Sequence, residues 1–167
     1  MTVSGGEPLF QSDFTAELLK MCRKSGIHTA IETSGFSDEG RLISVIEQCD
    51  LILFDIKETD DLLHKRYTGV SLKPILANLN IINEMKIPFI IRAPIIPTFN
   101  DRESHFKELK SIRDSMECCQ GIQIMPYHRI GSYKYELLNK DNFCNYISEP
   151  TKEMIDAWEK IISMGSV

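Results

Sequence analysis

The 167-residue sequence has little that would mark an exported, membrane-spanning or nucleic-acid-binding protein. Its most apolar stretch, residues 87–99, is interrupted by Arg92 and three prolines, so it is too short to cross a bilayer. The N-terminus lacks the basic region and apolar run of a signal peptide. The net charge of −5 disfavours a nucleic-acid or anionic-membrane surface, because both attract a basic face. We therefore expect a cytoplasmic protein with neither a nucleic-acid nor a membrane partner.

The cysteines lack a metal-binding pattern. The sequence has five, and none of their spacings is CxxC or CxxxCxxC, so the chain shows no cysteine signature for a metal or a cluster. An odd count without an export signal indicates reduced thiols. Cys118 and Cys119 could form a redox pair, but we favour two half-buried thiols at the end of a helix.

Strand-like and helix-like runs alternate along the whole chain. Strands are predicted at residues 2–4, 28–33, 51–57, 88–96 and 121–127. The middle strands are almost continuously apolar, which is typical of parallel strands buried on both faces. Helices are predicted at residues 12–25, 39–48, 71–86, 102–116 and from about 150 to the end. This order predicts a single α/β domain with a parallel sheet, either a partial barrel or an open doubly wound sheet.

Each predicted helix carries an apolar stripe that we expect to face the core. Residues 58–70 and 128–149 are expected to be surface loops, and a polar, aromatic-rich loop as long as the second is typically functional. The predicted core residues are Phe14, Leu18, Met21 and Cys22; Leu42, Val45, Ile46 and Cys49; Leu72, Leu76, Leu79 and Ile82; Phe106, Leu109, Ile112 and Met116; and Met154, Ile155, Trp158, Ile161 and Ile162.

Polar residues follow the predicted strands at the points where ligands bind in parallel α/β proteins, which are the carboxyl ends of the strands. Each has a structural alternative: two glycines can be a simple tight turn, and a charged pair can be an internal salt bridge. Five strands that deliver such groups to one rim favour a binding site. In strand order the residues are Gly5, Gly6 and Glu7; Glu32, Thr33, Ser34 and Gly35; Asp55 and Lys57; Arg92 and Pro94; and Tyr127 and His128.

The chemistry of this rim suits a zwitterionic ligand that carries a sugar. Lys57 and Arg92 can bind a carboxylate or phosphate, whereas Glu32 and Asp55 can bind an ammonium group, ribose hydroxyls or a cation. Buried charges in such apolar strands must be paired or bound to a ligand, because an unpaired one costs several kcal/mol. A phosphate-binding glycine loop is disfavoured, since the carboxylate of Glu7 would repel a phosphate.

Five motifs, in order, resemble those of the glycyl-radical-enzyme activating enzymes, the radical S-adenosylmethionine proteins typified by pyruvate formate-lyase activating enzyme. They are "TVSGGEP", "HTAIETSGF", "LILFDIKETDDLLHKRYTGVS", "IIRAPIIPTFND" and "MPYHRIGSYKYELL". The resemblance covers about residues 2–140. It implies an incomplete (β/α)6 barrel, of which residues 1–167 would form five units in one domain closed by a helix in residues 150–167.

The resemblance also implies roles for the rim residues with S-adenosylmethionine. Gly5, Gly6 and Glu7 would form the turn that holds its amino end. Glu32 stands where the family commonly has an aspartate that contacts the ammonium group, and Lys57 would bind the methionine carboxylate. The remaining implied contacts are Thr33 and Asp55 with the ribose or a cation, and His128 with the ribose.

Two further implied roles concern catalysis and a cation. Arg92 would support the radical intermediate at the active-site end. A monovalent-cation site would use Glu32, Thr33, Asp55 and the backbone carbonyl of Leu53. We assign no role to the motif "PTFND", where Thr98 replaces the family's usual glycine.

The family's reaction requires a 4Fe–4S cluster, which the resemblance places on a CxxxCxxC loop after the first strand. Reductive cleavage of S-adenosylmethionine there releases a 5′-deoxyadenosyl radical, which abstracts hydrogen from a glycine of a partner such as pyruvate formate-lyase. A flavodoxin or ferredoxin-type protein would donate the electron. The motif is absent here. We therefore expect a fragment or remnant that begins at the family's second strand and is inactive alone.

Two alternatives remain open. A cluster-free protein could keep the pocket for nucleoside binding or the surface for partner binding. A lyase could use Lys57 as a Schiff-base nucleophile. We rank the lyase last, because Asp55 two residues away favours the protonated form of Lys57.

Overall fold

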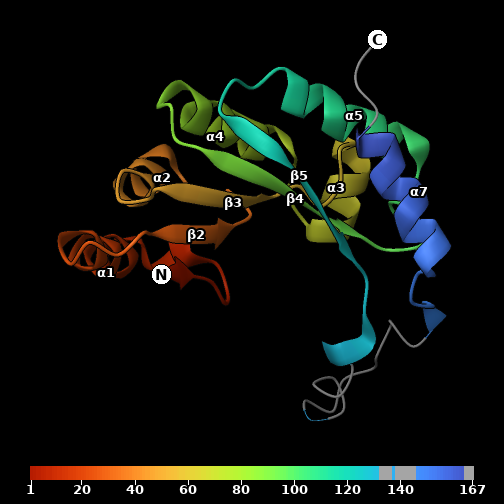
Figure 1. The fold of residues 1–167 in the computed structure, drawn as a ribbon, viewed down its shortest axis with the longest axis horizontal. Coiled ribbons are helices and arrows are strands. Elements are labelled where there is room, and N and C mark those ends of the chain that lie inside the picture. Colours follow the sequence, from red (N-terminus) through yellow and green to blue (C-terminus); the bar gives the residue numbers. More distant parts are fainter. Residues whose placement is uncertain (132–136, 138–145, 164–167) are drawn as a thin grey trace.

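A computed structural model describes residues 1–131, 137 and 146–163, and Figure 1 shows its fold. Five strands form one sheet in the order β1-β2-β3-β4-β5, and every neighbouring pair is parallel. Their carboxyl ends therefore lie at the same edge. The strands are β1 (Thr2–Val3), β2 (Ala30–Thr33), β3 (Leu51–Asp55), β4 (Phe89–Ile95) and β5 (Cys119–Pro126), which confirms the five predicted strands.

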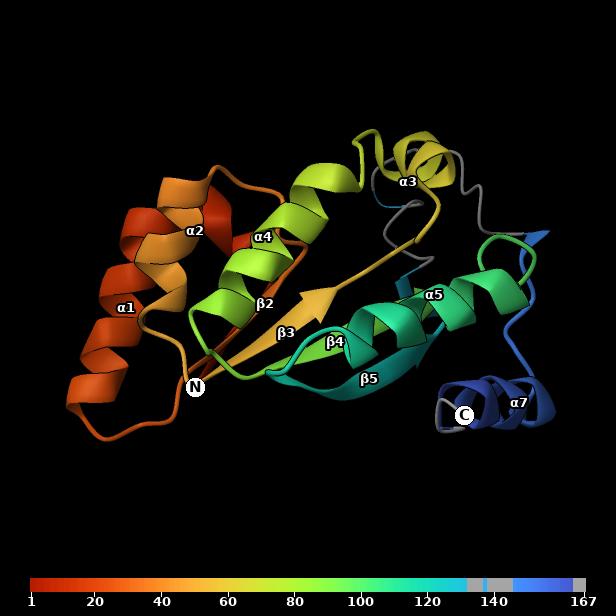
Figure 2. The ribbon, with the colours of Figure 1, turned by 90° about the horizontal axis from the view of Figure 1, so that it is seen from above.

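The connecting helices cover one face of this sheet. Figure 2 shows α1 (Ser12–Lys24), α2 (Glu39–Ile46), α4 (Lys73–Glu84) and α5 (Glu103–Asp114) in a row over the strands. Helix α7 (Lys152–Ser163) packs against α5 and β5. Short 3-10 helices lie at η1 (Pro8–Gln11) and η2 (Arg129–Gly131). The predicted α/β fold, an open and partial parallel barrel, is confirmed.

Helix α3 (Asp61–Thr68) lies in a segment that we predicted to be a loop, so that prediction is wrong. Asp60 caps its first turn by accepting a 2.9 Å hydrogen bond from the backbone N–H of Leu63. Gly69 ends it in the left-handed conformation, with φ 85°. The helix buries only His64, so it lacks the apolar stripe by which the other helices were found. Figure 2 places α3 beyond the carboxyl end of β3.

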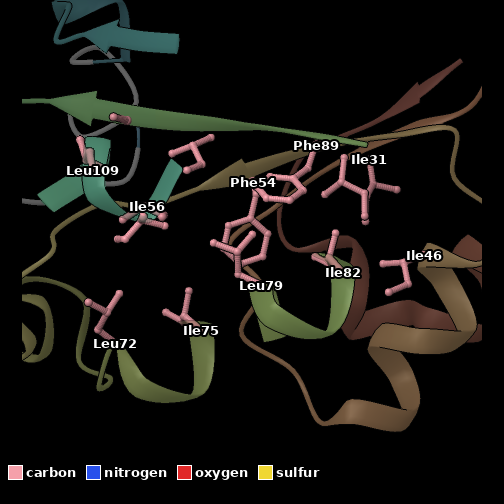
Figure 3. Packing of buried hydrophobic residues seen from close by; sticks show 14 of the residues in the cluster. Ile31, Ile46, Phe54, Ile56, Leu72, Ile75, Leu79, Ile82, Phe89 and Leu109 are labelled. Carbon is pink, nitrogen blue, oxygen red and sulfur yellow. The ribbon is translucent and has the colours of Figure 1, made fainter. Parts of the chain in front are cut away.

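The core lies between the sheet and the helices (Figure 3). Ile52, Phe54 and Ile56 point from β3 and the residue after it into this layer and are fully buried, as are Leu79 and Ile82 of α4. Along β3 and β4 buried residues alternate with half-buried ones. The prediction that these strands are buried on both faces is therefore wrong for the described residues. The half-buried face carries the charged residues of the rim.

Most predicted core stripes are confirmed, but that of α1 is wrong. Phe14 and Met21 are 66% and 65% exposed, whereas Thr15 and Leu19 are buried. Thr15 faces inward because its hydroxyl donates a 3.0 Å hydrogen bond to the carbonyl of Pro8. The confirmed buried residues are Leu42, Val45, Ile46, Cys49, Leu72, Leu79, Ile82, Phe106, Leu109, Ile112, Trp158 and Ile162, and the partly buried ones include Leu76, Met116, Met154, Ile155 and Ile161.

Other predictions concern the cysteines, the long loop and the membrane. Cys118 and Cys119 are half-buried free thiols as expected, but Cys119 opens β5 and neither ends a helix. Most of the predicted loop at 128–149 lies outside the described residues. Within the described part of the chain, no helix has the length and apolar character needed to cross a bilayer.

Candidate S-adenosylmethionine site

The carboxyl edge of the sheet brings together an ion pair from two non-adjacent strands. Arg92 on β4 pairs with Glu32 on β2, across the intervening β3. Both side chains are largely buried, at 14% and 28% exposed. Ser4, directly after β1, donates a 2.5 Å hydrogen bond to the other Glu32 oxygen. The expected anionic partner of Arg92 is thus a protein carboxylate.

The arginine retains a free donor. Its second terminal nitrogen lies 3.4 Å from the sulfur of Met125, which is a weak acceptor. Its Nε is buried and has no hydrogen-bond acceptor among the described residues. A buried guanidinium N–H without an acceptor is costly, so a ligand with an oxygen at this position would satisfy it.

The turn after β1 is held by Glu7. One oxygen of its carboxylate accepts a 2.5 Å hydrogen bond from the hydroxyl of Thr33, and the other accepts from the backbone N–H (2.9 Å) and hydroxyl (2.6 Å) of Ser34. Gly5 and Gly6 have φ values of +86° and +60°, a region that glycine adopts without a steric penalty. Glu7 and Thr33 therefore bond to each other, and the glycine backbone is the part of the turn open to a ligand.

Asp55 and Lys57 form a looser pair on the same rim. Their charged atoms are 3.9 Å apart, and the Lys57 side chain is 45% exposed. Burial raises the pKa of Asp55; Lys57 counteracts this, and the negative charge of Glu7 adds to it. A cavity of about 280 Å³ opens beside the pair and is also lined by Ser34 and His64. An ammonium group next to a carboxylate is a poor Schiff-base nucleophile, which argues against the lyase hypothesis.

The structure says less about the roles of the remaining predicted site residues. Leu53 is half-buried and stands in register with Glu32 on β2. The side chain of Thr33 is engaged with Glu7, so the predicted monovalent-cation site stays a prediction. His128 is exposed, two residues beyond the end of β5.

Three residues of this region were not predicted, whereas Ser34 was expected at the rim directly after β2. Ser4 directly follows β1, so position alone could have identified it. Met125 and Asn100 gave no signal, because their roles depend on which atoms the fold brings to them.

Comparison with known proteins identifies the class to which this fold and rim belong. The family model described as the radical SAM superfamily matches residues 1–109. Pyruvate formate-lyase-activating enzyme of Clostridium pasteurianum is 34% identical over 162 residues, covering 97% of this chain and 68% of the relative. Isethionate sulfite-lyase activating enzyme of Nitratidesulfovibrio vulgaris is 38% identical over 143 residues, covering 84% of this chain and 46% of the relative.

A solved structure agrees with these relatives. A domain of pyruvate-formate lyase-activating enzyme from Bacteroides vulgatus superposes with a TM-score of 0.79 at 27% identity, covering 98% of this chain and 92% of that one. The chain belongs to the radical SAM superfamily and groups with its glycyl-radical-enzyme activating enzymes. It spans about half the length of several of the curated relatives that it matches.

The family implies two groups, S-adenosylmethionine and a 4Fe–4S cluster, and the described residues fit only the first. Lys57 and the open glycine turn suit the charged methionine end of S-adenosylmethionine, Asp55 suits its ribose, and the unsatisfied Nε of Arg92 suits a further acceptor of the same ligand. No group of three His, Cys, Asp or Glu side chains that could hold a metal occurs in the described ranges. We therefore derive no step through the cluster.

Proposed function

We propose that this chain is the S-adenosylmethionine-binding part of an activating enzyme that installs a glycyl radical on a partner enzyme. The supporting observation is the juxtaposition of two cation–anion pairs, Arg92–Glu32 and Lys57–Asp55, at one rim of the sheet. Their charges complement a ligand that has an ammonium and a carboxylate group on the same end. The chain would form five of the six β/α units of the barrel.

In this proposal each group has a defined task at the methionine or ribose end. The backbone of the Gly5–Gly6 turn, fixed by Glu7, and the carboxylate of Glu32 bind the amino group, and Lys57 binds the carboxylate. Asp55 and His128 bind the ribose. Arg92, held by Glu32, directs its free N–H at the reacting end. When bound and reductively cleaved, S-adenosylmethionine supplies a 5′-deoxyadenosyl radical.

The partners follow from the family and are part of the proposal. The protein substrate is a glycyl-radical enzyme, and the electron donor is of the flavodoxin or ferredoxin type. The described residues provide no cluster ligands, so we propose that the 167-residue chain alone does not cleave S-adenosylmethionine. Anaerobic incubation with iron and sulfide should leave it without the visible absorbance of a 4Fe–4S cluster. A stable three-thiolate cluster would refute this part.

Calorimetry with two ligands tests the binding site. S-adenosylmethionine and its decarboxylated analogue differ by the carboxylate alone. We expect the wild-type chain to prefer the intact ligand, and Lys57→Met to remove that preference, about tenfold in affinity, because one charge-assisted contact is lost. Lys107→Met, an exposed lysine on α5, is the matched control and should keep the preference. Equal affinity of the wild type for both ligands, or no binding of either, contradicts the proposal.

A further inference from the structure

Asn100 is a buried side chain that joins the ends of two strands. It lies in the loop between β4 and α5 and is 4% exposed. Its amide nitrogen donates to the carbonyl of Lys57 at 2.8 Å and to the carbonyl of Pro94 at 2.7 Å. Its oxygen accepts from the backbone N–H of Ile96 at 2.7 Å. Both amide hydrogens are thus committed to holding β4 and the segment after β3 at a fixed separation.

The need for this side chain follows from Pro94. The backbone N–H of Ile56 donates to the carbonyl of Arg92 at 2.9 Å, which extends the β3–β4 ladder by one step. In a parallel pair the next donor on β4 would be residue 94, and proline has no N–H. The carboxamide of Asn100 therefore provides hydrogen bonds between the two segments at the point where the backbone ladder stops.

The residue after Lys57 is fixed from the same loop and helix. Glu58 is fully buried, and one of its oxygens accepts from the backbone N–H groups of Thr59 (2.8 Å) and Asp60 (3.0 Å) and from Arg102 (2.7 Å). The hydroxyl of Thr59 lies 2.8 Å from Nδ1 of His105 on α5. The backbone is therefore held before the Lys57 carbonyl at Ile56 and after it at Glu58 and Thr59, while the lysine head remains exposed at the rim.

We propose that Asn100 is a positioning residue for S-adenosylmethionine binding, which sets the backbone at Lys57 so that the ammonium group meets the ligand carboxylate. This rests on the proposed function, because it takes Lys57 as the carboxylate contact. Lys57 lies two residues past the end of β3, so the strand ladder does not hold it directly. A long, flexible side chain binds with less entropy loss when its backbone is already fixed. Asn100 acts on the ligand only through Lys57.

A double-mutant cycle separates positioning from general stabilisation. The variants Asn100→Ala, Lys57→Met and the double mutant are titrated with S-adenosylmethionine and with its decarboxylated analogue. We expect Asn100→Ala to weaken binding of the intact ligand about tenfold, with little effect on the analogue. In the Lys57→Met background it should have no further effect, because the contact that it positions is gone. If the alanine variant does not fold, Asn100→Ser, which keeps one hydrogen-bond donor, is used in its place.

The matched control is another buried asparagine whose amide also donates to two backbone carbonyls. Asn78 on α4 donates to the carbonyls of Gly35 (2.7 Å) and Ser37 (2.9 Å), and neither bond involves Lys57. Asn78→Ala should lower stability without changing the preference for the intact ligand. The positioning role is refuted, and the proposed function is not, if Asn100→Ala lowers the affinity for both ligands equally. The same holds if Asn100→Ala weakens binding as much in the Lys57→Met background as in the wild type. A wild-type chain that binds neither ligand refutes the proposed function, and this inference with it.

Discussion

Arg92 and Glu32 pair across a strand that lies between them. Arg92 is on β4 and Glu32 is on β2, with β3 in the middle of the trio. The pair therefore crosses β3, on which Leu53 is in register with Glu32 and Asp55 is in register with Arg92. An ion pair of this kind links β2 to β4 at the rim and holds the free N–H of Arg92 in one orientation.

A double-mutant cycle on this pair measures its contribution. Arg92→Met and Glu32→Gln should each destabilise the chain, and the double mutant should lose less than the sum, with a coupling energy of about 1–2 kcal/mol because both groups are largely buried. Urea unfolding followed by circular dichroism is the measurement. Coupling near zero would show that the pair does not hold the rim.

Gly35 cannot carry a side chain. It has φ +70°, and a Cβ built on it would lie 2.3 Å from a ring carbon of Phe54 in the core. We expect Gly35→Ala to lower the free energy of unfolding by about 2–4 kcal/mol, through backbone strain and overpacking together. Gly69 has φ +85° but open space around it, so Gly69→Ala should cost only about 1 kcal/mol. Equal losses for the two variants would contradict the packing argument.

Thr98 has a backbone conformation that glycine adopts more easily than threonine. It has φ +70°, which is unfavourable for a β-branched residue. Its backbone N–H donates to Asp101 at 2.8 Å, and glycine would keep this bond. We expect Thr98→Gly to raise the free energy of unfolding by about 1 kcal/mol, net of the entropy cost of glycine.

Lys86 provides the comparison for Thr98. It also has positive φ, at 60°, but is not β-branched. Lys86→Gly should therefore give a smaller gain than Thr98→Gly in the same thermal and urea unfolding experiments. A loss of stability in Thr98→Gly would show that the threonine side chain makes a compensating contact.

Stability should fall in mild acid because of His105. Burial lowers the pKa of His105 to about 4; Glu58 raises it and Arg102 lowers it. In the unfolded chain the pKa is the ordinary 6.5. The folded state thus favours the neutral ring, which adds at most about 3 kcal/mol to the free energy of unfolding. This contribution is complete above pH 6.5 and is lost as pH falls toward 4.

Variants isolate the His105 effect. His105→Gln should flatten the loss of stability between pH 6.5 and 4.5 in urea unfolding, whereas His28→Gln, at an exposed histidine, should leave it unchanged. Asp55 has a raised pKa and so acts in the opposite direction, stabilising the fold as pH falls through its folded pKa. A wild-type chain that is equally stable across this range would contradict the buried neutral His105.

Repeated local patterns explain why the strand order could be predicted. Parallel strands such as β3 and β4 carry dense apolar runs. A helix such as α2 carries one apolar stripe, Leu42–Val45–Ile46, so the pattern indicates which face packs on the sheet. Helix α1 has two adjacent stripes, and the hydroxyl of Thr15 decides between them by bonding to Pro8. Pattern alone could not predict that choice. Nor could it find α3, which buries too little to show a stripe.

The charged rim was predictable as a set of residues, but its pairings were not. Position at the carboxyl ends of parallel strands predicts that Glu32, Asp55, Lys57 and Arg92 share an edge. That Arg92 reaches over β3 to Glu32, and that Glu7 bonds to Thr33, depends on side-chain directions in three dimensions. The same holds for Asn100, which contacts Lys57 from 43 residues away.

Titration of the ¹⁵N-labelled chain with S-adenosylmethionine, followed by amide chemical shifts, tests the central claim most directly. We expect the shifts to be concentrated at the rim, at Gly5, Gly6, Asp55 and Lys57. With the decarboxylated analogue, the shift at Lys57 should be much smaller. Shifts confined to the helical face of the sheet, or no shifts with the ligand in large excess over the protein, would contradict the assignment of this rim as the S-adenosylmethionine site.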